Sequence, residues 1–314
     1  MKRTTEGWGS GLLAVLIFSG SLPATRVGVA DFSPIFLTCA RAVIAALLGS
    51  VCLFTLRQPW PERRDIVPLA LVALGGVVGF PLLTALALQH ITAAYSIVFI
   101  GLLPLATALF GVLRGGERPK PAFWLFSIIG AAAVAGFALY NSKGGHFTDD
   151  LLMVAAILVC GLGYAEGATL SRRLGGWQVI SWALLLSMPC MAVIALAYLP
   201  ARWGDIHLSS WLGLGYVSIF SMLIGFMFWY RGLALGGIAH VGQLQLLQPF
   251  FGLMLAALFL HEPIAWFLTG STLIYCLCVA GAKRFSRSIA LSSSWPAMRT
   301  FQTQAYDPDL GRAC

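Results

Sequence analysis

Long apolar stretches alternate with short polar connectors from the beginning of the chain to about residue 284. Each stretch is about twenty residues long, and an α-helix of that length, rising about 1.5 Å per residue, crosses the hydrocarbon of a bilayer. A single buried core does not account for so many stretches. We therefore predict an all-α integral membrane protein with ten transmembrane helices, at residues 9–29, 34–56, 66–88, 91–113, 122–141, 149–170, 177–199, 209–232, 238–260 and 264–284.

The connectors are short and rich in turn-forming residues, as at Gly115–Gly116, Gly144–Gly145 and Gly236–Gly237. These glycine pairs lack the strand and helix that flank a nucleotide-binding loop, so we interpret them as turns. No soluble domain is inserted between the predicted helices. Residues 1–8 form a short N-terminus, and residues 285–314 form a polar tail that we expect to be loosely ordered.

The composition supports the membrane assignment. Of 314 residues, 59% are hydrophobic and 10% are charged, against about a quarter charged in an ordinary soluble domain. The net charge is +8, but the basic residues lie in small clusters between apolar stretches, where they indicate topology rather than nucleic-acid binding. We expect no nucleic-acid partner.

The positive charges concentrate on one side of the predicted bundle. Counting Lys and Arg in alternate connectors leaves only Lys143 and Arg202 on the other side. Because basic connectors stay on the cytoplasmic side, we predict that both termini are cytoplasmic and that the chain is a multi-pass protein of the cell inner (plasma) membrane. The richer side holds the basic tail from Lys283 together with Lys2, Arg3, Arg57, Arg63, Arg64, Arg114, Arg118, Lys120, Arg172, Arg173 and Arg231.

The first predicted helix has a second interpretation. Lys2 and Arg3 precede an apolar run from Leu12 to Phe18, and small residues follow near Ala30. This order is also typical of a secretory signal peptide. A signal peptide would leave nine spans and would remove one helix from the first half of the chain.

Two segments of the chain repeat, 145 residues apart. Pro104 lies thirteen residues before Glu117, and Pro249 lies thirteen residues before Glu262. Only five glutamates occur in the chain, so this match is more informative than matching leucines. It predicts a duplicated chain.

The two halves, residues 9–141 and 149–284, each hold five predicted helices. Because five is an odd number, equivalent helices point in opposite directions, which puts Glu117 on the cytoplasmic side and Glu262 on the outer side. Two inverted repeats allow one central site to open alternately to the two faces of the membrane. This architecture favours a secondary transporter.

Several motifs accompany the repeat. They are Ser33–Pro34 ahead of a helix that carries Arg41, Thr92–Ser96, Pro104 and Gly116–Arg118 in the first half, and Ile238–Val241, Gln248–Pro249 and His261–Pro263 in the second half. In these motifs, and over residues 9–284 as a whole, the chain resembles the EamA-type members of the drug/metabolite transporter superfamily.

The resemblance implies two five-helix repeats and the export of amino acids, metabolites or drugs, or the carriage of nucleotide-sugar-like solutes as in related branches. The chain departs from the family pattern at Ala239–Gly242, where an alanine–serine run is common. It also has no arginine in the seventh helix to match Arg41. These departures leave the substrate open.

Arg41 and Glu166 lie inside predicted helices, where a charge is costly and suggests a function. Arg41 is a candidate to bind a substrate carboxylate or phosphate through its guanidinium group. The alternative is that it reaches outward or binds helix-end carbonyls near Asp31. Glu166 is the only carboxylate well within a predicted helix, so it is the candidate for proton coupling.

The ninth predicted helix is the most polar one. His240 lies near its beginning, and Gln245 and Gln248 share one face because they are three residues apart. Gln248 is about ten residues from the start of the helix, so it lies about 15 Å deep, near the bilayer centre. We predict that these side chains line a substrate cavity; the alternative is hydrogen bonding between helices.

Other substrate-binding candidates are Tyr95 in the fourth helix, Trp229 in the eighth, and Thr84, with Phe80–Pro81, in the third. Trp229 and its neighbour Tyr230 lie near the predicted inner boundary. That position also fits an interfacial aromatic belt.

Two prolines and two glutamates have structural interpretations. Pro104 and Pro249 each remove an amide donor from the middle of a helix, and we interpret them as helix hinges. Glu117 and Glu262 follow the ends of long helices, where a carboxylate can cap the amides of a helix N-terminus. We assign both glutamates to structural loops.

The seven cysteines lie mostly inside apolar segments and lack paired CxxC spacing. They are interpreted as packing residues, because the pattern supports neither a disulfide framework nor a metal site. We expect no catalytic residue, no metal and no cofactor.

Together these features predict a secondary transporter, and more specifically an exporter of small organic solutes such as amino acids, metabolites or drug-like compounds. Its mechanism would be alternating access around a mid-membrane cavity. The alternatives are an intramembrane enzyme, which needs clustered His, Asp, Glu or Cys, and a receptor or scaffold. The expected partners are a small-molecule substrate and the lipid bilayer, and both a monomer and a homodimer stay open.

Overall fold

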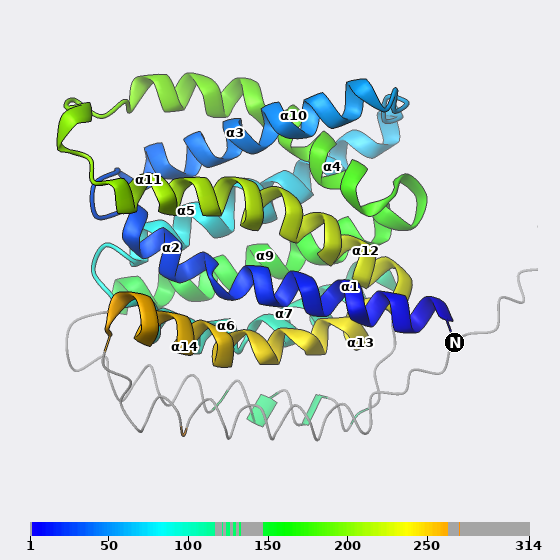
Figure 1. Ribbon diagram of the computed structural model, residues 1–314. Helices are drawn as coiled ribbons and strands as arrows, with labels where there is room; N and C mark the ends of the chain where they lie inside the picture. The colour runs from blue at the N-terminus through cyan, green and yellow to red at the C-terminus, as the bar shows by residue number, and fades with distance from the viewer. Residues whose placement is uncertain are drawn as a thin grey trace, which may run out of the picture.

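The computed structural model describes residues 2–116 and 147–262, together with the single positions 121, 124, 125, 128, 129, 132 and 270. Within these residues every ordered element is a helix, and there is no strand. Eight spans are long and apolar enough to cross a membrane, and they lie side by side as one bundle (Figure 1). Two of the ten predicted helices, 122–141 and 264–284, lie almost wholly outside the described residues.

The eight spans begin and end close to the predicted positions, and no end differs by more than four residues. Spans one to four are α1 (Lys2–Ser19) with α2 (Ser21–Gly28), α3 (Pro34–Thr55), α4 (Ile66–Val72) with η2 (Ala73–Gly79) and α5 (Phe80–Ala87), and α6 (Ala93–Ile100) with α7 (Leu103–Gly115). The sixth to ninth spans are α9 (Phe147–Leu174), α10 (Gly176–Ala197), α11 (Leu208–Gly215) with η5 (Tyr216–Gly225) and α12 (Phe226–Gly236), and α13 (Ile238–Gly242) with η6 (Gln243–Leu247) and α14 (Gln248–Leu260). Short 3₁₀ turns, η1 (Arg63–Asp65) and η4 (Trp203–Asp205), precede the third and eighth spans.

Two helix starts in the first half follow directly from the sequence. The Ser33 hydroxyl accepts a hydrogen bond from the Phe36 amide at 3.2 Å, ahead of Pro34 at the first position of α3. The Thr92 hydroxyl accepts one from the Tyr95 amide at 3.2 Å at the start of α6. Both side chains satisfy amides that have no partner within the helix.

Breaks in the helices recur at the same places in the two halves. The π-helix η2 (Ala73–Gly79) interrupts the third span, and shifting its numbers by 145 gives 218–224, which lies inside the π-helix η5 (Tyr216–Gly225) of the eighth span. Pro104 and Pro249 each take the second position of a new helix after a break, in α7 and in α14. The duplication is thus visible in the backbone as well as in the sequence.

The ends of α7 and α14 also match. Gly116 and His261, again 145 residues apart, both adopt left-handed backbone conformations, with φ of 66° and 51°. Their amides donate to the carbonyls of Gly111 and Ala256, which are related by the same shift. Histidine rarely adopts this conformation, whereas glycine does so freely.

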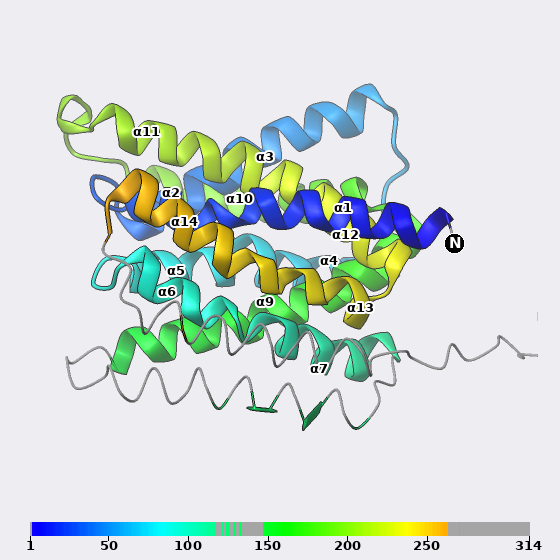
Figure 2. The ribbon, with the colours of Figure 1, turned by 60° about the horizontal axis from the view of Figure 1, so that its bottom comes forward.

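Equivalent spans pack against each other in opposite directions. In α3 and α10, Cys39 Sγ lies 3.7 Å from Met191 Sδ, and Gly49 faces Ser181. Residue numbers therefore rise along one helix as they fall along the other. The fourth and ninth spans behave in the same way, because α6 contacts α14 while α7 contacts α13 (Figures 1 and 2).

Helix α9 packs against α4, η2, α5 and α7. Gly75 and Gly163 let it approach the third span closely, since a Cβ atom on Gly163 would lie 3.0 Å from the Cα of Gly75. Small residues at such crossings are typical of helices packed inside membranes. The outward-facing side chains are apolar, as at Leu47, Val51 and Val193, which suits contact with lipid.

The aromatic belt predicted as one option for Trp229 and Tyr230 is wrong. Both side chains are 0% exposed and lie in the core of the bundle. Trp229 packs against Tyr164, with 5.3 Å between ring centroids, and Tyr230 donates its hydroxyl to the carbonyl of Gly163 at 3.3 Å.

The first span belongs to the same core. Ala14 and Val15 are 0% exposed, and α1 packs along α12 through the close approach of Gly7 and Gly236. This packing favours a membrane-spanning role for the first span over the signal-peptide interpretation.

Candidate functional site

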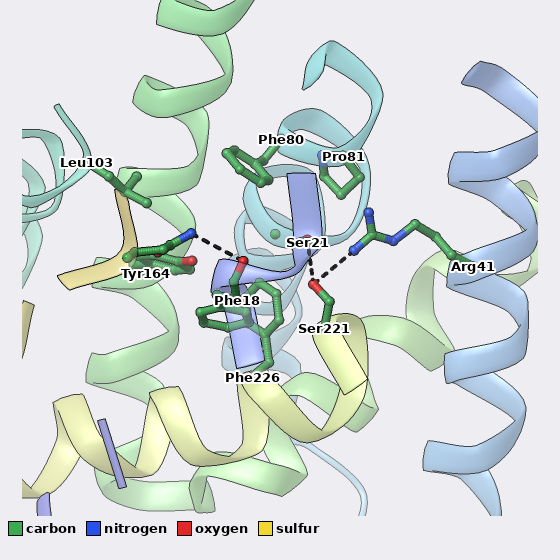
Figure 3. Close-up of a pocket in the computed structure, with 11 residues that line it drawn as sticks. Phe18, Ser21, Arg41, Phe80, Pro81, Leu103, Tyr164, Ser221 and Phe226 are labelled. Atoms are coloured by element: carbon green, nitrogen blue, oxygen red, sulfur yellow. Dashed lines mark hydrogen bonds between the residues drawn. The ribbon is translucent and has the colours of Figure 1, made fainter. Parts of the chain in front are cut away.

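A small cavity lies at the centre of the bundle, between the two halves of the chain (Figure 3). The volume open to the centre of a water molecule is about 20 Å³, which is room for one or two waters. Seven spans contribute to its wall. The lining residues are Phe18, Ser21, Arg41, Gly76, Phe80, Pro81, Leu103, Tyr164, Ser221, Phe226 and Gln248.

Among the described residues that line this cavity, Arg41 is the only cation. Its side chain is 4% exposed and its Nη2 donates to Ser221 Oγ at 3.4 Å (Figure 3). Its Nε has no hydrogen-bond partner, and no carboxylate pairs with it in the described part of the chain. The alternative in which Arg41 reaches outward is therefore wrong, because the side chain turns toward the cavity.

Two serines connect Arg41 to the first span. Ser221, in the π-helix η5, lies 2.8 Å from Ser21 through their hydroxyl oxygens. Ser21 follows the break between α1 and α2. The resulting chain of guanidinium and two hydroxyls offers donors to an anionic or carbonyl oxygen.

Gln248 lines the same cavity from the ninth span. It is 6% exposed; its Nε2 donates to the carbonyl of Phe18 at 3.4 Å, and its Oε1 has no partner in the described structure. An unpaired buried amide oxygen costs free energy. A bound water or solute would relieve that cost.

Aromatic rings form the apolar part of the wall. The centroid of Phe18 lies 5.3 Å from that of Phe226 and 6.5 Å from that of Tyr164, and Trp229 packs 5.3 Å from Tyr164. Trp229 packs against the lining residue Tyr164 but does not itself line the cavity. The cavity is thus cationic and polar on one side and aromatic on the other.

Two other predicted substrate-binding residues are buried near the cavity but do not line it. Gln245 is 0% exposed, and neither of its side-chain polar atoms has a hydrogen-bond partner among the described residues. Thr84 donates its hydroxyl to the carbonyls of Phe80, at 2.7 Å, and Pro81, at 3.1 Å. Its neighbours Phe80 and Pro81 reach the wall instead.

Tyr95 and His240 lie far from the centre, at opposite ends of the bundle. The Tyr95 hydroxyl donates to Asp150 at 3.0 Å, at the start of α9. The ring of His240 packs edge-on against Trp8 of α1, with 5.2 Å between centroids. Each residue begins its span, so neither can reach the cavity.

Glu166 lines a second cavity of about 240 Å³ near the end of α9, with Arg64, Asp65, Pro68, Thr169, Leu170 and Arg173. Its carboxylate pairs with Arg114 at the end of α7. The candidate coupling residue is therefore separate from the central cavity. No group of three His, Cys, Asp or Glu side chains that could hold a metal ion occurs in the described residues.

The predicted hinge and loop residues have clear neighbours. Pro104 and Pro249 each adjoin a lining residue, Leu103 and Gln248. Glu262 accepts hydrogen bonds from the amides of Ala93, at 3.0 Å, and Ala94. Glu117 lies outside the described residues.

Sequence reasoning missed the two serines and three of the aromatic residues in the wall, Phe18, Tyr164 and Phe226. Serines are common in apolar spans, and Ser21 and Ser221 stand 200 residues apart. The one signal in the sequence was that both serines lie in apolar spans that also contain glycines. The aromatic residues gave no signal among so many apolar positions.

A model of the EamA-like transporter family matches residues 7–139 and again residues 148–282. The chain is 61% identical over 287 residues to an uncharacterized transporter, YdeK, of Bacillus subtilis, covering 91% of this chain and 100% of that protein. It is 25% identical to a probable terminal-alkyne amino-acid exporter of Streptantibioticus cattleyicolor, covering 83% and 88%. It is 24% identical to an aromatic amino acid exporter, YddG, of Ancylobacter novellus, covering 89% and 96%.

A crystal structure of a protein with 20% sequence identity has the same fold. The TM-score is 0.67, and the alignment covers 90% of this chain and 98% of that one.

Proposed function

The chain belongs to the EamA-like transporter family, whose domain it contains twice, and we propose that it exports small solutes that carry a carboxylate, foremost amino acids with an apolar or aromatic side chain. Its relatives are transporters and not enzymes. The solute would bind in the central cavity and cross the membrane by alternating access.

The buried guanidinium of Arg41 is the observation that carries this proposal. A cation inside a membrane bundle is costly unless an anion or several hydrogen bonds offset its charge. A solute carboxylate can accept from Arg41 and from the hydroxyls of Ser21 and Ser221. The rings of Phe18 and Phe226 suit the side chain of such a solute, and two of the relatives are named as amino-acid exporters.

Transport requires the bundle to move. The central cavity of about 20 Å³ holds one or two waters and is too small for an amino acid. The antiparallel packing of equivalent spans supports two inverted repeats, residues 9–141 and 149–284, that rock around the cavity. With the charge bias of the connectors, we further propose ten transmembrane helices and both termini on the cytoplasmic side of the inner membrane.

Proteoliposomes provide the test. Vesicles that contain the protein are loaded with phenylalanine or with phenethylamine, which has the same ring and amine but no carboxylate, and efflux is followed with and without an imposed proton gradient. We expect efflux of phenylalanine well above that of phenethylamine. Equal efflux of the two, or efflux no faster than from vesicles without protein, would overturn the proposal.

A further inference from the structure

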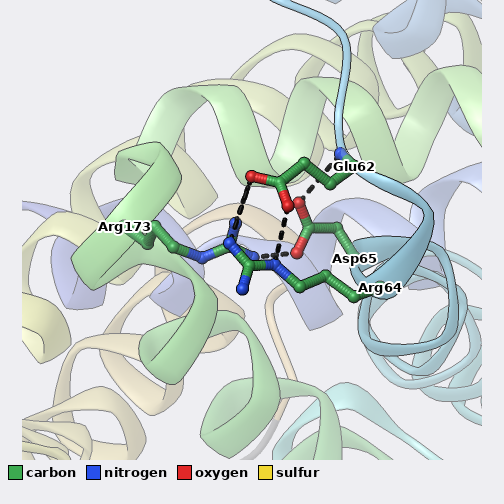
Figure 4. Close-up of polar contacts among 4 residues, drawn as sticks. All are labelled: Glu62, Arg64, Asp65 and Arg173. Carbon is green, nitrogen blue, oxygen red and sulfur yellow. Dashed lines mark hydrogen bonds and ion pairs between the residues drawn. The ribbon is translucent and has the colours of Figure 1, made fainter.

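Several polar contacts join the two halves of the chain, such as Arg114 with Glu166 and Glu262 with Ala94. Two others lie at corresponding places in the repeats, at opposite ends of the bundle. The first, which we name the Asp65 latch, lies at the beginning of the third span. Asp65 is 1% exposed and pairs with Arg173 near the end of α9 (Figure 4). Glu62 adds to it, with its Oε1 3.6 Å from Arg173 Nη1 and its amide donating to Asp65 at 3.0 Å.

The second contact, which we name the Asp31 latch, lies between the first and second spans. The Asp31 carboxylate accepts from the Ser210 hydroxyl at 2.7 Å and from the His207 amide at 2.8 Å. The His207 ring Nδ1 lies 3.1 Å from the same carboxylate oxygen. His207 and Ser210 stand at the beginning of the eighth span, in the second half.

The two latches occupy equivalent positions in the duplicated chain. Adding 145 to Glu62 and Asp65 gives His207 and Ser210, so the beginning of the third span in one repeat corresponds to the beginning of the eighth in the other. Their partners lie at similar places but not at matching positions, because Arg173 minus 145 gives Gly28, three residues before Asp31. Arg173 ends the sixth span, which is the first helix of the second repeat, and Asp31 follows the first span.

Helix α3 (Pro34–Thr55) separates the latches in space, because Asp31 precedes its beginning and Asp65 follows its end.

A second pair of contacts also occupies equivalent places in the two repeats. Tyr95 of the fourth span reaches Asp150 at the start of α9, while the equivalent His240 packs against Trp8 at the start of α1. The equivalence is therefore a property of the fold and not an accident of one contact.

We propose that the Asp65 latch and the Asp31 latch are the two gate contacts of the transport cycle and are broken alternately. This inference rests on the proposed alternating-access function. Rocking of one half against the other separates the segments at one end and leaves the other end closed, so each opening must break one latch. The charge bias of the connectors makes the Asp65 latch the cytoplasmic gate.

The chemistry of the two latches differs. Both carboxylates accept charge-assisted hydrogen bonds. Asp65 pairs with the full positive charge of a guanidinium group, whereas Asp31 accepts from a hydroxyl and a backbone amide and lies beside an imidazole. Neutralising Asp65 should therefore shift the bundle toward opening at that end alone.

The test reads access to the central cavity from each side, without any solute. Ser221→Cys places a thiol of similar size in the cavity wall, and a membrane-impermeant maleimide is applied to either face of sealed vesicles of known orientation. With Asp65→Asn we expect labelling from the cytoplasmic side to rise about tenfold, which corresponds to about 1.4 kcal/mol. With Asp31→Asn and Ser210→Ala together, labelling should rise from the outer side instead.

Three controls keep the test decisive. The charge swap Asp65→Arg with Arg173→Asp should return labelling toward the parent level, which a merely misfolded protein would not do. The same vesicles without the new cysteine correct for the native thiols, of which Cys190 is exposed. Ser21→Cys serves as a second reporter if Ser221→Cys lowers the yield.

The proposal is overturned if each latch variant raises labelling from both sides alike, or if neither variant changes labelling from either side. Amino-acid efflux is measured separately. If the protein does not export phenylalanine but labelling stays side-specific, only the proposed function is contradicted. If efflux is normal but the latch variants leave labelling unchanged, only the gate proposal is contradicted.

Discussion

The carboxylate of Glu262 accepts a hydrogen bond from the amide of Ala94 at 2.8 Å, across 168 residues of sequence. The glutamate at the end of α14 thereby caps the beginning of α6, a helix of the other half. A carboxylate at this position satisfies free amides and offsets the positive end of the helix dipole. The fourth and ninth spans are fastened together by this contact.

Glu262→Ala should lower the thermal stability of the protein by about 1 kcal/mol, the usual cost of a lost N-terminal cap. Glu262→Gln, which keeps one acceptor oxygen, should cost less. Thermal unfolding of the purified protein in detergent measures both. Asp205→Asn, in an exposed pair with Arg202 at 4.0 Å, is the matched control and should change little; an equal loss in the control would remove the special role of Glu262.

Arg41→Gln should weaken the transport of carboxylated solutes by about 10- to 100-fold in apparent affinity, because hydrogen bonds to charged groups are worth about 1.5–3 kcal/mol. Arg41→Lys keeps the charge but loses the planar geometry and should retain part of the activity. Proteoliposome efflux of phenylalanine measures the effect, with Arg202→Gln as an exposed control. If Arg41→Gln lowers protein yield and affects acids and amines alike, the role of Arg41 is structural.

Gln248→Ala should reduce solute affinity by about fivefold while expression is unchanged, as expected for the loss of a neutral hydrogen bond of about 1 kcal/mol. The unpaired Oε1 in the cavity wall is the reason for this expectation. Solute-concentration curves in proteoliposomes provide the measurement. Gln89→Ala, on an exposed loop residue, is the control, and unchanged kinetics for Gln248→Ala would remove this residue from the site.

Gly75→Ala should destabilise the bundle by about 1–3 kcal/mol, the usual range for overpacking. A Cβ atom at Gly75 would overlap the backbone carbonyl of Val159 in α9, and backbone cannot give way as a flexible side chain can. Gly9→Ala in α1 has open space around it and should be neutral or slightly stabilising, because alanine favours helix. The unfolding temperature should therefore fall for Gly75→Ala and stay unchanged or rise slightly for Gly9→Ala.

The Asp31 latch should weaken only in strong acid. The hydrogen bond from Ser210, followed by that from the His207 amide, lowers the pKa of Asp31 below its ordinary value of 3.8. Because the pKa of Asp31 is lower in the folded protein than in the unfolded chain, the ionised carboxylate stabilises the latch at pH values above the unfolded pKa. This contribution is lost as the pH falls through the folded pKa. The readout is outer-side labelling of Ser221→Cys in a His207→Gln background, divided at each pH by the labelling of the same protein after unfolding, which removes the pH dependence of the thiol itself. This ratio should stay flat through neutral pH and rise below about 3.8, and Asp31→Asn should abolish that rise.

Much of the fold could be predicted from the hydrophobic pattern, because span length is set by bilayer thickness. The breaks within spans could not, since a π-helix such as η2 and a 3₁₀ segment such as η6 arise from packing rather than from a local signal. Trp229 illustrates the consequence. Counting residues places it near a boundary, but its burial depends on packing against Tyr164 of another span, which the local sequence does not contain.

The site was predicted in part for a related reason. Arg41 and Gln248 are polar residues in apolar spans, so their cost in the membrane marks them from sequence alone. Ser21 and Ser221 acquire meaning only through contacts across 200 residues, which no local pattern contains. Tyr95 and His240 have the right chemistry, but each begins its span and lies at an end of the bundle.

The two π-helices also fix the direction in which the helices after them face. An aromatic residue follows each one, Phe80 after η2 and Phe226 after η5, and both rings reach the cavity wall. A π-turn holds one residue more than an α-turn, so deleting one residue would rotate the following helix by about 100° and swing its ring off the wall. Shifting Phe80 by 145 gives Gly225 and not Phe226, so the two repeats place an aromatic ring on the wall from neighbouring positions, each just after an irregular turn.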